Sequence, residues 1–315
     1  MQQPESGRAR VDIVQRFAVE QQSVRGQFVR LGPAWLALRE HGDYPEPVRR
    51  MLGEAVTAAV LLASALKFDG ELTLQLQGDG AVRLLVAQCT HDFRVRAVAR
   101  FDQERVEASV RGGALDDPFA ALAGAGTQIV TVEADRRASR YQGVVSISGG
   151  SLAASLEHYF ENSEQLPTGV VLGADDFGTA GLLVQRMPGH GGVVTAFGDT
   201  ADRTFAAART AIGSVQRDEL LARPPEDLMR RAFSGLDLRV HDSHPISFRC
   251  RCSRERVSGM LRSLGLEEVR SIIAEQQSVT VTCEFCHRPW RFDPVDALRL
   301  FGAAVDQVPG STTLN

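Results

Sequence analysis

Two cysteine-containing stretches decide how the carboxy-terminal part of this chain folds: FRCRCSRERV at residues 248–257 and VTCEFCHRPWRFDPVDALRL at residues 281–300. They hold four of the five cysteines, spaced as Cys-x-Cys, 30 intervening residues and Cys-x-x-Cys. Zinc prefers four thiolates in a tetrahedron, and two close pairs brought together by the intervening fold provide that shape. We therefore predict one zinc ion per chain in the reduced form. Its ligands are Cys250, Cys252, Cys283 and Cys286.

The residues between and after the two pairs indicate a small domain. Ser253 is a suitable N-cap and Gly265 a suitable stop for a helix. Its apolar residues recur at i, i+3, i+4 and i+7, which predicts one inward face: Val257, Met260, Leu261 and Leu264. Three further elements are expected: a helix with Val269, Ile272 and Ile273 inward, a strand at 279–281, and a helix from Asp293-Pro294.

Such a domain has little core of its own, so a metal would supply what burial does not. Structural zinc contributes on the order of 10–16 kcal/mol in small peptides. That exceeds the net stability of a typical small domain. We expect the domain to unfold when the metal leaves.

Several nearby residues allow more than one interpretation. Four arginines surround the first pair: Arg249, Arg251, Arg254 and Arg256. They either offset the charge of about −2 on a four-thiolate zinc centre or form a solvated helix face, and the sequence favours neither. The fifth cysteine, Cys89, lies alone in an apolar strand and is expected to be an inert buried thiol.

Two other ligand schemes are weaker. Residues 283–287 match the Cys-x-x-Cys-His pattern of haem attachment, but that chemistry belongs to exported proteins and leaves the first cysteine pair unused. His241, His244 or His287 could replace a cysteine as a ligand. A complete set of four cysteines makes such a replacement unnecessary.

The chain before residue 235 predicts an α+β fold, because strands come in runs and helices are interspersed irregularly. The expected strands are 24–31, 72–77, 82–89, 94–100, 128–133 and 143–148, and the expected helices 34–39, 47–66, 151–159, 203–211 and 225–233. The helix at 47–66 is apolar on nearly every face and should be central. We expect a large amino-terminal domain at 1–234, a linker or weakly packed segment at 235–249 and a zinc-binding domain at 250–315.

Composition restricts the function classes. A formal charge of −4 gives no reason to expect nucleic acid as a partner. No signal peptide and no membrane-spanning stretch are apparent, which favours the cytoplasm. There is no phosphate-binding loop, and no paired carboxylates lie next to a base or nucleophile. We therefore expect no catalytic residues, no cofactor besides zinc, and a protein that is not an enzyme.

Many stretches resemble one family in the same order. In the carboxy-terminal region they are the two cysteine stretches and LGLEEVRSII (264–273). Upstream they are VRGQFVRL (24–31), LLASALKFDGELTLQLQGDGAVRLLVAQC (61–89), YQGVVSIS (141–148) and HYFENSEQLPT (158–168). Together they resemble the 33 kDa chaperonin family, the redox-regulated heat-shock holdases. Arg251 and Trp290 depart from residues common in that family, but neither is a ligand.

The resemblance implies an ATP-independent chaperone that is inactive when reduced and zinc-bound and active when oxidised. On that expectation, disulfides form between Cys250 and Cys252 and between Cys283 and Cys286, the neighbours closest in sequence. Zinc then leaves, the carboxy-terminal domain unfolds, and apolar surface binds unfolded or aggregation-prone client proteins. The family also implies a homodimer on oxidative activation.

Two other function classes are compatible with parts of the sequence. A zinc ribbon that binds nucleic acid is permitted by the arginines near Cys250, and a steep salt dependence in filter binding would favour it. A thiol–disulfide oxidoreductase could use Cys283 and Cys286, and turnover in an insulin-reduction assay would favour that enzyme. The acidic charge counts against the first, and the additional Cys-x-Cys pair against the second.

Overall fold

A computed structural model describes residues 11–19, 23–111, 118–134, 139–187 and 197–302. Tertiary contacts divide the chain into two compact units, Met1–Arg249 and Cys250–Asn315, here called the amino-terminal unit and the cysteine unit. Three sheets, almost entirely antiparallel, are combined with helices. This arrangement confirms the predicted α+β class.

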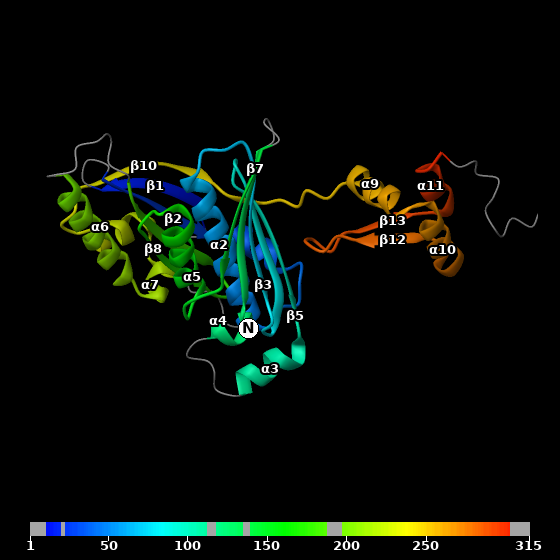
Figure 1. Ribbon diagram of the computed structural model, residues 1–315, viewed down its shortest axis with the longest axis horizontal. Helices are drawn as coiled ribbons and strands as arrows, with labels where there is room; N and C mark the ends of the chain where they lie inside the picture. The colour runs from blue at the N-terminus through cyan, green and yellow to red at the C-terminus, as the bar shows by residue number, and fades with distance from the viewer. Residues whose placement is uncertain (1–10, 20–22, 112–117, 135–138, 188–196, 303–315) are drawn as a thin grey trace, which may run out of the picture. The chain divides into compact units, whose positions relative to one another are not determined.

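The amino-terminal unit is organised around helix α2 (Glu46–Ala65). Alanine, leucine and methionine favour a helix here, and Pro47 near its start needs no hydrogen-bond partner for its nitrogen. The helix packs against strands of both large sheets of this unit (Figure 1), and most of its side chains are buried. The prediction of a central helix, made for 47–66, is confirmed.

One side of α2 is covered by a six-stranded sheet in the order β11-β5-β4-β3-β6-β7. Its strands are β3 (Gly70–Gly78), β4 (Val82–Thr90), β5 (Arg94–Phe101), β6 (Gly126–Ala134), β7 (Ser139–Ser146) and β11 (Ser247–Phe248). The predicted hairpin is present, with Leu72 opposite Cys89 and Leu76 opposite Leu85. Its turn needs Gly80, because a Cβ there would lie 2.3 Å from the carbonyl oxygen of Leu122.

The other side of α2 is covered by a five-stranded sheet in the order β10-β1-β2-β9-β8. Its strands are β1 (Ile13–Val19), β2 (Val24–Leu31), β8 (Thr168–Ala174), β9 (Thr179–Arg186) and β10 (Leu238–Pro245). A second apolar cluster joins this sheet to three helices: α6 (Phe197–Gly213), α7 (Arg217–Ala222) and α8 (Pro225–Ala232). The expected helix at 203–211 falls within α6. The expected helix at 225–233 almost coincides with α8.

Residues 235–249 differ from the expected linker. Most of them form β10, which pairs with β1, and β11, which runs parallel to β5. Ile246 between these strands is buried. The sequence pattern was misleading because the β10 side chains are nearly all exposed, so the strand has no apolar alternation. Backbone pairing places this segment in the amino-terminal unit.

The remaining helices of this unit are short: α1 (Pro33–Arg39), α3 (Gln103–Arg111), α4 (Pro118–Ala123), α5 (Leu152–Tyr159) and the π-helical turn η2 (Phe160–Glu164). The predicted start of α5 is confirmed, since the Ser151 hydroxyl accepts a hydrogen bond from the Ala154 N–H. No helix in the described part of the chain is both long and apolar enough to cross a membrane.

The cysteine unit contains α9 (Arg254–Leu264), α10 (Leu266–Gln276), the hairpin β12 (Val279–Thr282) and β13 (Pro289–Phe292), and α11 (Pro294–Arg299). Both predicted N-caps are confirmed, as Ser253 accepts from the Arg256 N–H and Asp293 from the Asp296 N–H. Met260 and Leu264 are 47% and 49% exposed, so the prediction that they face inward was wrong. This small unit covers only one narrow stripe of α9, centred on Val257 and Leu261.

Candidate metal centre

The four cysteines come from two segments with different local structure. Cys250 and Cys252 lie in the extended stretch that precedes α9. Cys283 and Cys286 lie in the turn between β12 and β13, where the Cys283 N–H donates to the Arg288 carbonyl and the His287 N–H donates to the Cys283 carbonyl. His287 itself has a φ of 50°, a left-handed conformation that closes the turn. Backbone hydrogen bonds therefore hold the second pair on one tight loop.

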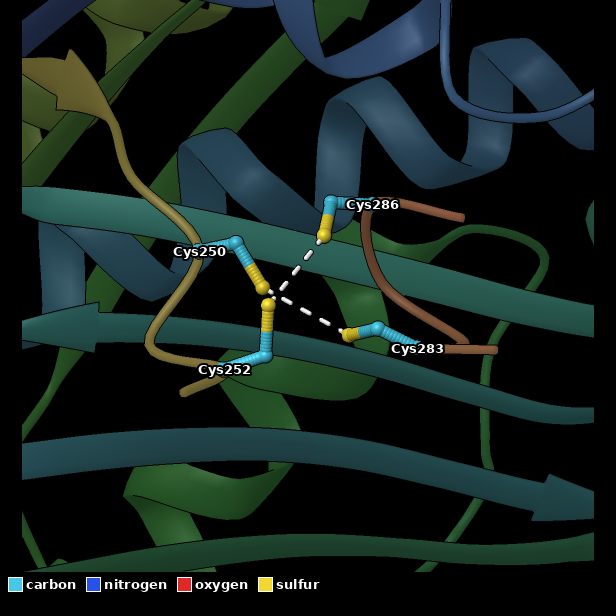
Figure 2. Close-up of side chains that lie close together, drawn as sticks. All are labelled: Cys250, Cys252, Cys283 and Cys286. Carbon is cyan, nitrogen blue, oxygen red and sulfur yellow. Dashed lines mark hydrogen bonds between the residues drawn. The ribbon is translucent and has the colours of Figure 1, made fainter. Parts of the chain in front are cut away.

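The four sulfurs converge (Figure 2), and all lie within 4.8 Å of one another. Cys250 Sγ is 3.6 Å from Cys283 Sγ, and Cys252 Sγ is 3.5 Å from Cys286 Sγ. A tetrahedron with zinc–sulfur bonds of about 2.3 Å has edges of about 3.8 Å. The arrangement of these sulfurs therefore fits a four-coordinate soft metal ion.

The electrostatics of the cluster also favour a cation. Burial raises the pKa of the Cys286 thiol, and hydrogen bonds with the other three sulfurs raise it further. Four thiolates at these distances would repel one another unless a divalent ion compensated their charge. A bound divalent ion stabilises the deprotonated sulfurs and displaces their protons.

Arg254, one of the four arginines near the first cysteine pair, has a structural role. Its guanidinium is 2.5 Å from an Asp296 carboxylate oxygen and donates to the Arg291 carbonyl at 3.0 Å. It also lies 4.2 Å from the centre of the Phe292 ring. Arg254 thus ties α9 to β13 and α11. Arg249 belongs to the amino-terminal unit, where its N–H donates to the Val95 carbonyl.

In the described part of the chain, no histidine belongs to the group that could hold a metal. His241 and His244 lie on β10 of the amino-terminal unit, where the His244 ring is 5.9 Å from the Phe93 ring. Among the described residues, the four cysteines form the one group of three or more His, Cys, Asp or Glu side chains that could hold a metal. Cys89 is fully buried, which confirms the predicted buried thiol, and burial raises its pKa, as expected for an unreactive cysteine.

Fold and site together define a two-unit α+β protein with a four-cysteine candidate metal centre in its smaller unit. The sequence model of the family described as Hsp33 protein matches residues 12–293. The chain belongs to the Hsp33 family, which confirms the resemblance found in its sequence motifs.

Curated relatives agree with this membership. A 33 kDa chaperonin of Chromobacterium violaceum is 40% identical, over 92% of this chain and 94% of its own length. One of Nitrosococcus oceani is 38% identical, over 96% of this chain and 98% of its own length. The crystal structure of the 33 kDa chaperonin from Thermotoga maritima has the same fold, with a TM-score of 0.77, 22% identity, and coverage of 92% of this chain and 98% of that one.

The family establishes the general class of function. Membership supports a chaperone, and with it the binding of unfolded client proteins. Chaperonins are not a class of enzyme, in agreement with the prediction that this chain is not one. The nucleic-acid and oxidoreductase alternatives have no support from these relatives.

Proposed function

We propose that this chain is a redox-regulated, ATP-independent holdase whose four cysteines hold one zinc ion in the reduced state. The observation that carries the proposal is the convergence of four sulfurs within 4.8 Å in a unit with few buried residues. Zinc, when bound, supplies the cross-link between the α9 side of the unit and the β12–β13 hairpin. Cys250, Cys252, Cys283 and Cys286 would hold it.

Oxidation would convert these ligands into disulfides. A peroxide oxidises one thiolate by two electrons to a sulfenic acid, with release of hydroxide from the peroxide. A second cysteine sulfur then attacks this sulfur, forms the S–S bond and expels water after proton transfer. Each disulfide consumes one equivalent of peroxide and removes two zinc ligands, so the ion leaves.

The pairing of the disulfides has two candidates. We propose Cys250–Cys252 and Cys283–Cys286, because partners one or two residues apart stay close even after the unit has begun to unfold. Sulfur–sulfur distances of 3.6 and 3.5 Å, however, join Cys250 to Cys283 and Cys252 to Cys286. Mass mapping of oxidised peptides distinguishes the two, because only the first pairing leaves residues 250–252 and 283–286 on separate, uncrosslinked peptides.

Unfolding of the cysteine unit would affect the amino-terminal unit through the peptide chain that joins them. β11 ends two residues before Cys250 and is only two residues long, and β10 lies just before it with exposed side chains. Both would be weakened when the following residues unfold. Detachment of β10 would uncover the edge of β1 and part of the apolar cluster around Phe17, which unfolded clients could bind.

Further features of the proposal are a homodimer on oxidation and a cytoplasmic location, where reducing conditions keep the thiols free until stress occurs. The balance of charge counts against a nucleic-acid zinc ribbon, since residues 250–315 have eight arginines and eight acidic residues. Four thiolates around a divalent ion would make the unit net negative.

The test follows zinc and client protection together. Reduced protein is treated with hydrogen peroxide under mild warming, while a zinc indicator and the light scattering of a heat-denatured client are recorded. We expect zinc release first and suppression of aggregation afterwards, both reversed by dithiothreitol with added zinc. Equal protection by reduced and oxidised protein would refute the switch.

A further inference from the structure

Residues 244–249, here called the strap, connect the end of β10 to β11 and lead into Cys250. β10 runs beside β1 (Figure 1), and Asp12, the residue just before β1, continues this contact. The Ile246 N–H donates to the Asp12 carbonyl at 3.0 Å. Two further strap amides donate to carbonyls at the start of β5: Ser247 to Phe93 and Arg249 to Val95. Backbone bonds therefore fasten the strap to the ends of strands in both large sheets.

Helix α1 provides the apolar support of the strap. Ile246 is 4% exposed and belongs to the same buried cluster as Ala34 and Trp35 of α1. Phe248 packs against this cluster, and its ring lies 5.0 Å from that of His41, just beyond the end of α1. The strap therefore stays closed only while α1 keeps its position.

The start of α1 depends on a residue from elsewhere in the chain. Its N-cap is Gly32, which has no side chain, and its first turn contains no acidic residue. The Asp12 carboxylate, 20 positions earlier, accepts from the Gly32 N–H at 2.8 Å and from the Ala34 N–H at 3.0 Å. Pro33 between them has no N–H to satisfy. Asp12 thus caps α1 in place of a local side chain, and its negative charge suits a helix N-terminus.

Asp12 consequently acts on the strap in two ways. Its carboxylate fixes the first turn of α1, and its carbonyl accepts from Ile246. The two are linked, because the charge-assisted bonds to α1 also restrain the backbone of Asp12 at the end of β1. One half-buried residue therefore determines both the backbone partner and the apolar support of the strap.

We propose that Asp12 is a positioning residue that keeps the strap closed and so sets how readily β10 detaches from β1. The inference rests on the proposed holdase function and deepens it by naming a controlling contact in the amino-terminal unit. Unfolding of the cysteine unit frees the strap at Cys250, but Ile246 stays bound until its contacts with Asp12 and α1 yield. Loss of the Asp12 carboxylate therefore opens the strap even while the four cysteines keep their metal.

The test of the strap is residue-resolved amide exchange by NMR on the full, reduced chain. Asp12→Ala should speed exchange of the Ile246, Ser247 and Arg249 amides about tenfold, as for the loss of an N-cap. Asp12→Asn keeps an acceptor oxygen but loses the charge at the helix terminus, so about threefold is expected. Amides of β2 and β9 should stay slow. Unchanged strap exchange in Asp12→Asn, with Asp12→Ala either unchanged or unfolded, would overturn the proposal.

Asp102 provides a matched control. Its carboxylate accepts from the Arg105 N–H at 3.1 Å at the start of α3, so it is also an aspartate cap of a short helix in the same unit. Asp102→Ala removes a comparable cap but none of the backbone partners of the strap. We expect a similar loss of thermal stability without faster strap exchange. Equal acceleration in Asp102→Ala and Asp12→Ala would reduce the role of Asp12 to general stability and overturn the proposal.

Client protection separates the positioning role from a merely structural one. Reduced Asp12→Ala should retain one zinc ion per chain, yet partly suppress the aggregation of a heat-denatured client before any oxidant is added. Loss of the zinc, or an opened strap without client protection, would contradict the inference. The holdase proposal fails on a different result, namely equal protection by reduced and oxidised wild-type protein.

Discussion

The two units of this chain are stabilised in different ways. The amino-terminal unit buries a long apolar helix between two sheets, and a second cluster fixes α6, α7 and α8 on the outer side of one sheet. The described part of the cysteine unit buries eight hydrophobic residues, drawn from three short helices and one hairpin. Burial alone is sufficient for the first unit and marginal for the second.

One chain can therefore combine a unit that is stable through burial with a unit whose folding would depend on a bound metal ion. In a unit with so small a core, a few metal–ligand bonds would determine whether the native state is populated. We therefore expect the cysteine unit to unfold on loss of the metal while the other unit remains folded. Changes to a ligand, to the pH, to the core and to a helix cap test that contrast, in order of decreasing expected effect.

Replacing one candidate ligand should have the largest effect. Cys286→Ser should abolish zinc retention and unfold the cysteine unit, because the contribution of the metal, on the order of 10 kcal/mol, exceeds what so small a core provides. NMR spectra should lose the dispersed amide signals of residues 254–299 and keep those of the sheets around α2. Cys89→Ala is the matched control, since that buried cysteine lies in the amino-terminal unit, and it should retain one zinc per chain.

Acidification should remove the metal without any mutation. Protons compete with zinc for the four sulfurs, and burial raises the pKa of the metal-free Cys286 thiol, so binding at neutral pH must displace protons. Stability of the cysteine unit is therefore present at higher pH and lost as pH falls. Zinc affinity measured against a competing chelator should rise with pH, with proton release detected by calorimetry in buffers of different ionisation enthalpy. A pH-independent affinity would argue against thiolate ligation.

A matched pair of leucine substitutions on α9 separates the buried stripe from the exposed face. Leu261→Ala should cost about 2–5 kcal/mol, since Leu261 is 1% exposed. Leu264→Ala should change stability by less than about 0.5 kcal/mol, apart from helix propensity, because that side chain is 49% exposed. Urea-induced zinc release, followed with a chromogenic indicator, measures both. Similar losses of stability for the two substitutions would show that the core of the unit is not centred on Leu261.

The smallest effect is expected at the start of α9. Ser253 accepts a hydrogen bond from the Arg256 N–H, so Ser253→Ala should destabilise the unit by about 1 kcal/mol. The same urea titration should show zinc release at a lower midpoint. Ser253→Asp, which restores an acceptor at the N-cap, should recover most of the loss. Failure of Ser253→Asp to do so would indicate that the cap is not the cause.

Much of this architecture could be predicted because its signals are local. The four cysteines, the two N-caps and the hairpin around Gly80 are each defined by a few neighbouring residues. The helix around Val56 was equally clear, since apolar residues occur on nearly every face of it, and most of its residues are buried. Patterns of this kind depend little on the rest of the fold.

What the sequence did not reveal depends on tertiary contacts. β10 has exposed side chains and is a strand only because β1 provides its hydrogen bonds. Met260 and Leu264 fit a helical apolar face, yet the unit is too small to cover that face. The structural role of Arg254 depends on Asp296, which is 42 positions later in the sequence and lies beside it in the fold. The Glu164 carboxylate likewise accepts hydrogen bonds from tyrosines of separate elements.

The most direct test of the account is metal analysis of anaerobically purified protein, combined with an NMR spectrum before and after chelation. We predict one zinc ion per chain, dispersed amide signals from the cysteine unit, and their collapse on removal of the ion, with the amino-terminal unit unchanged. A metal-free preparation in which α9, α10 and the β12–β13 hairpin keep their native signals would contradict the central claim that four sulfurs and one cation hold this unit together.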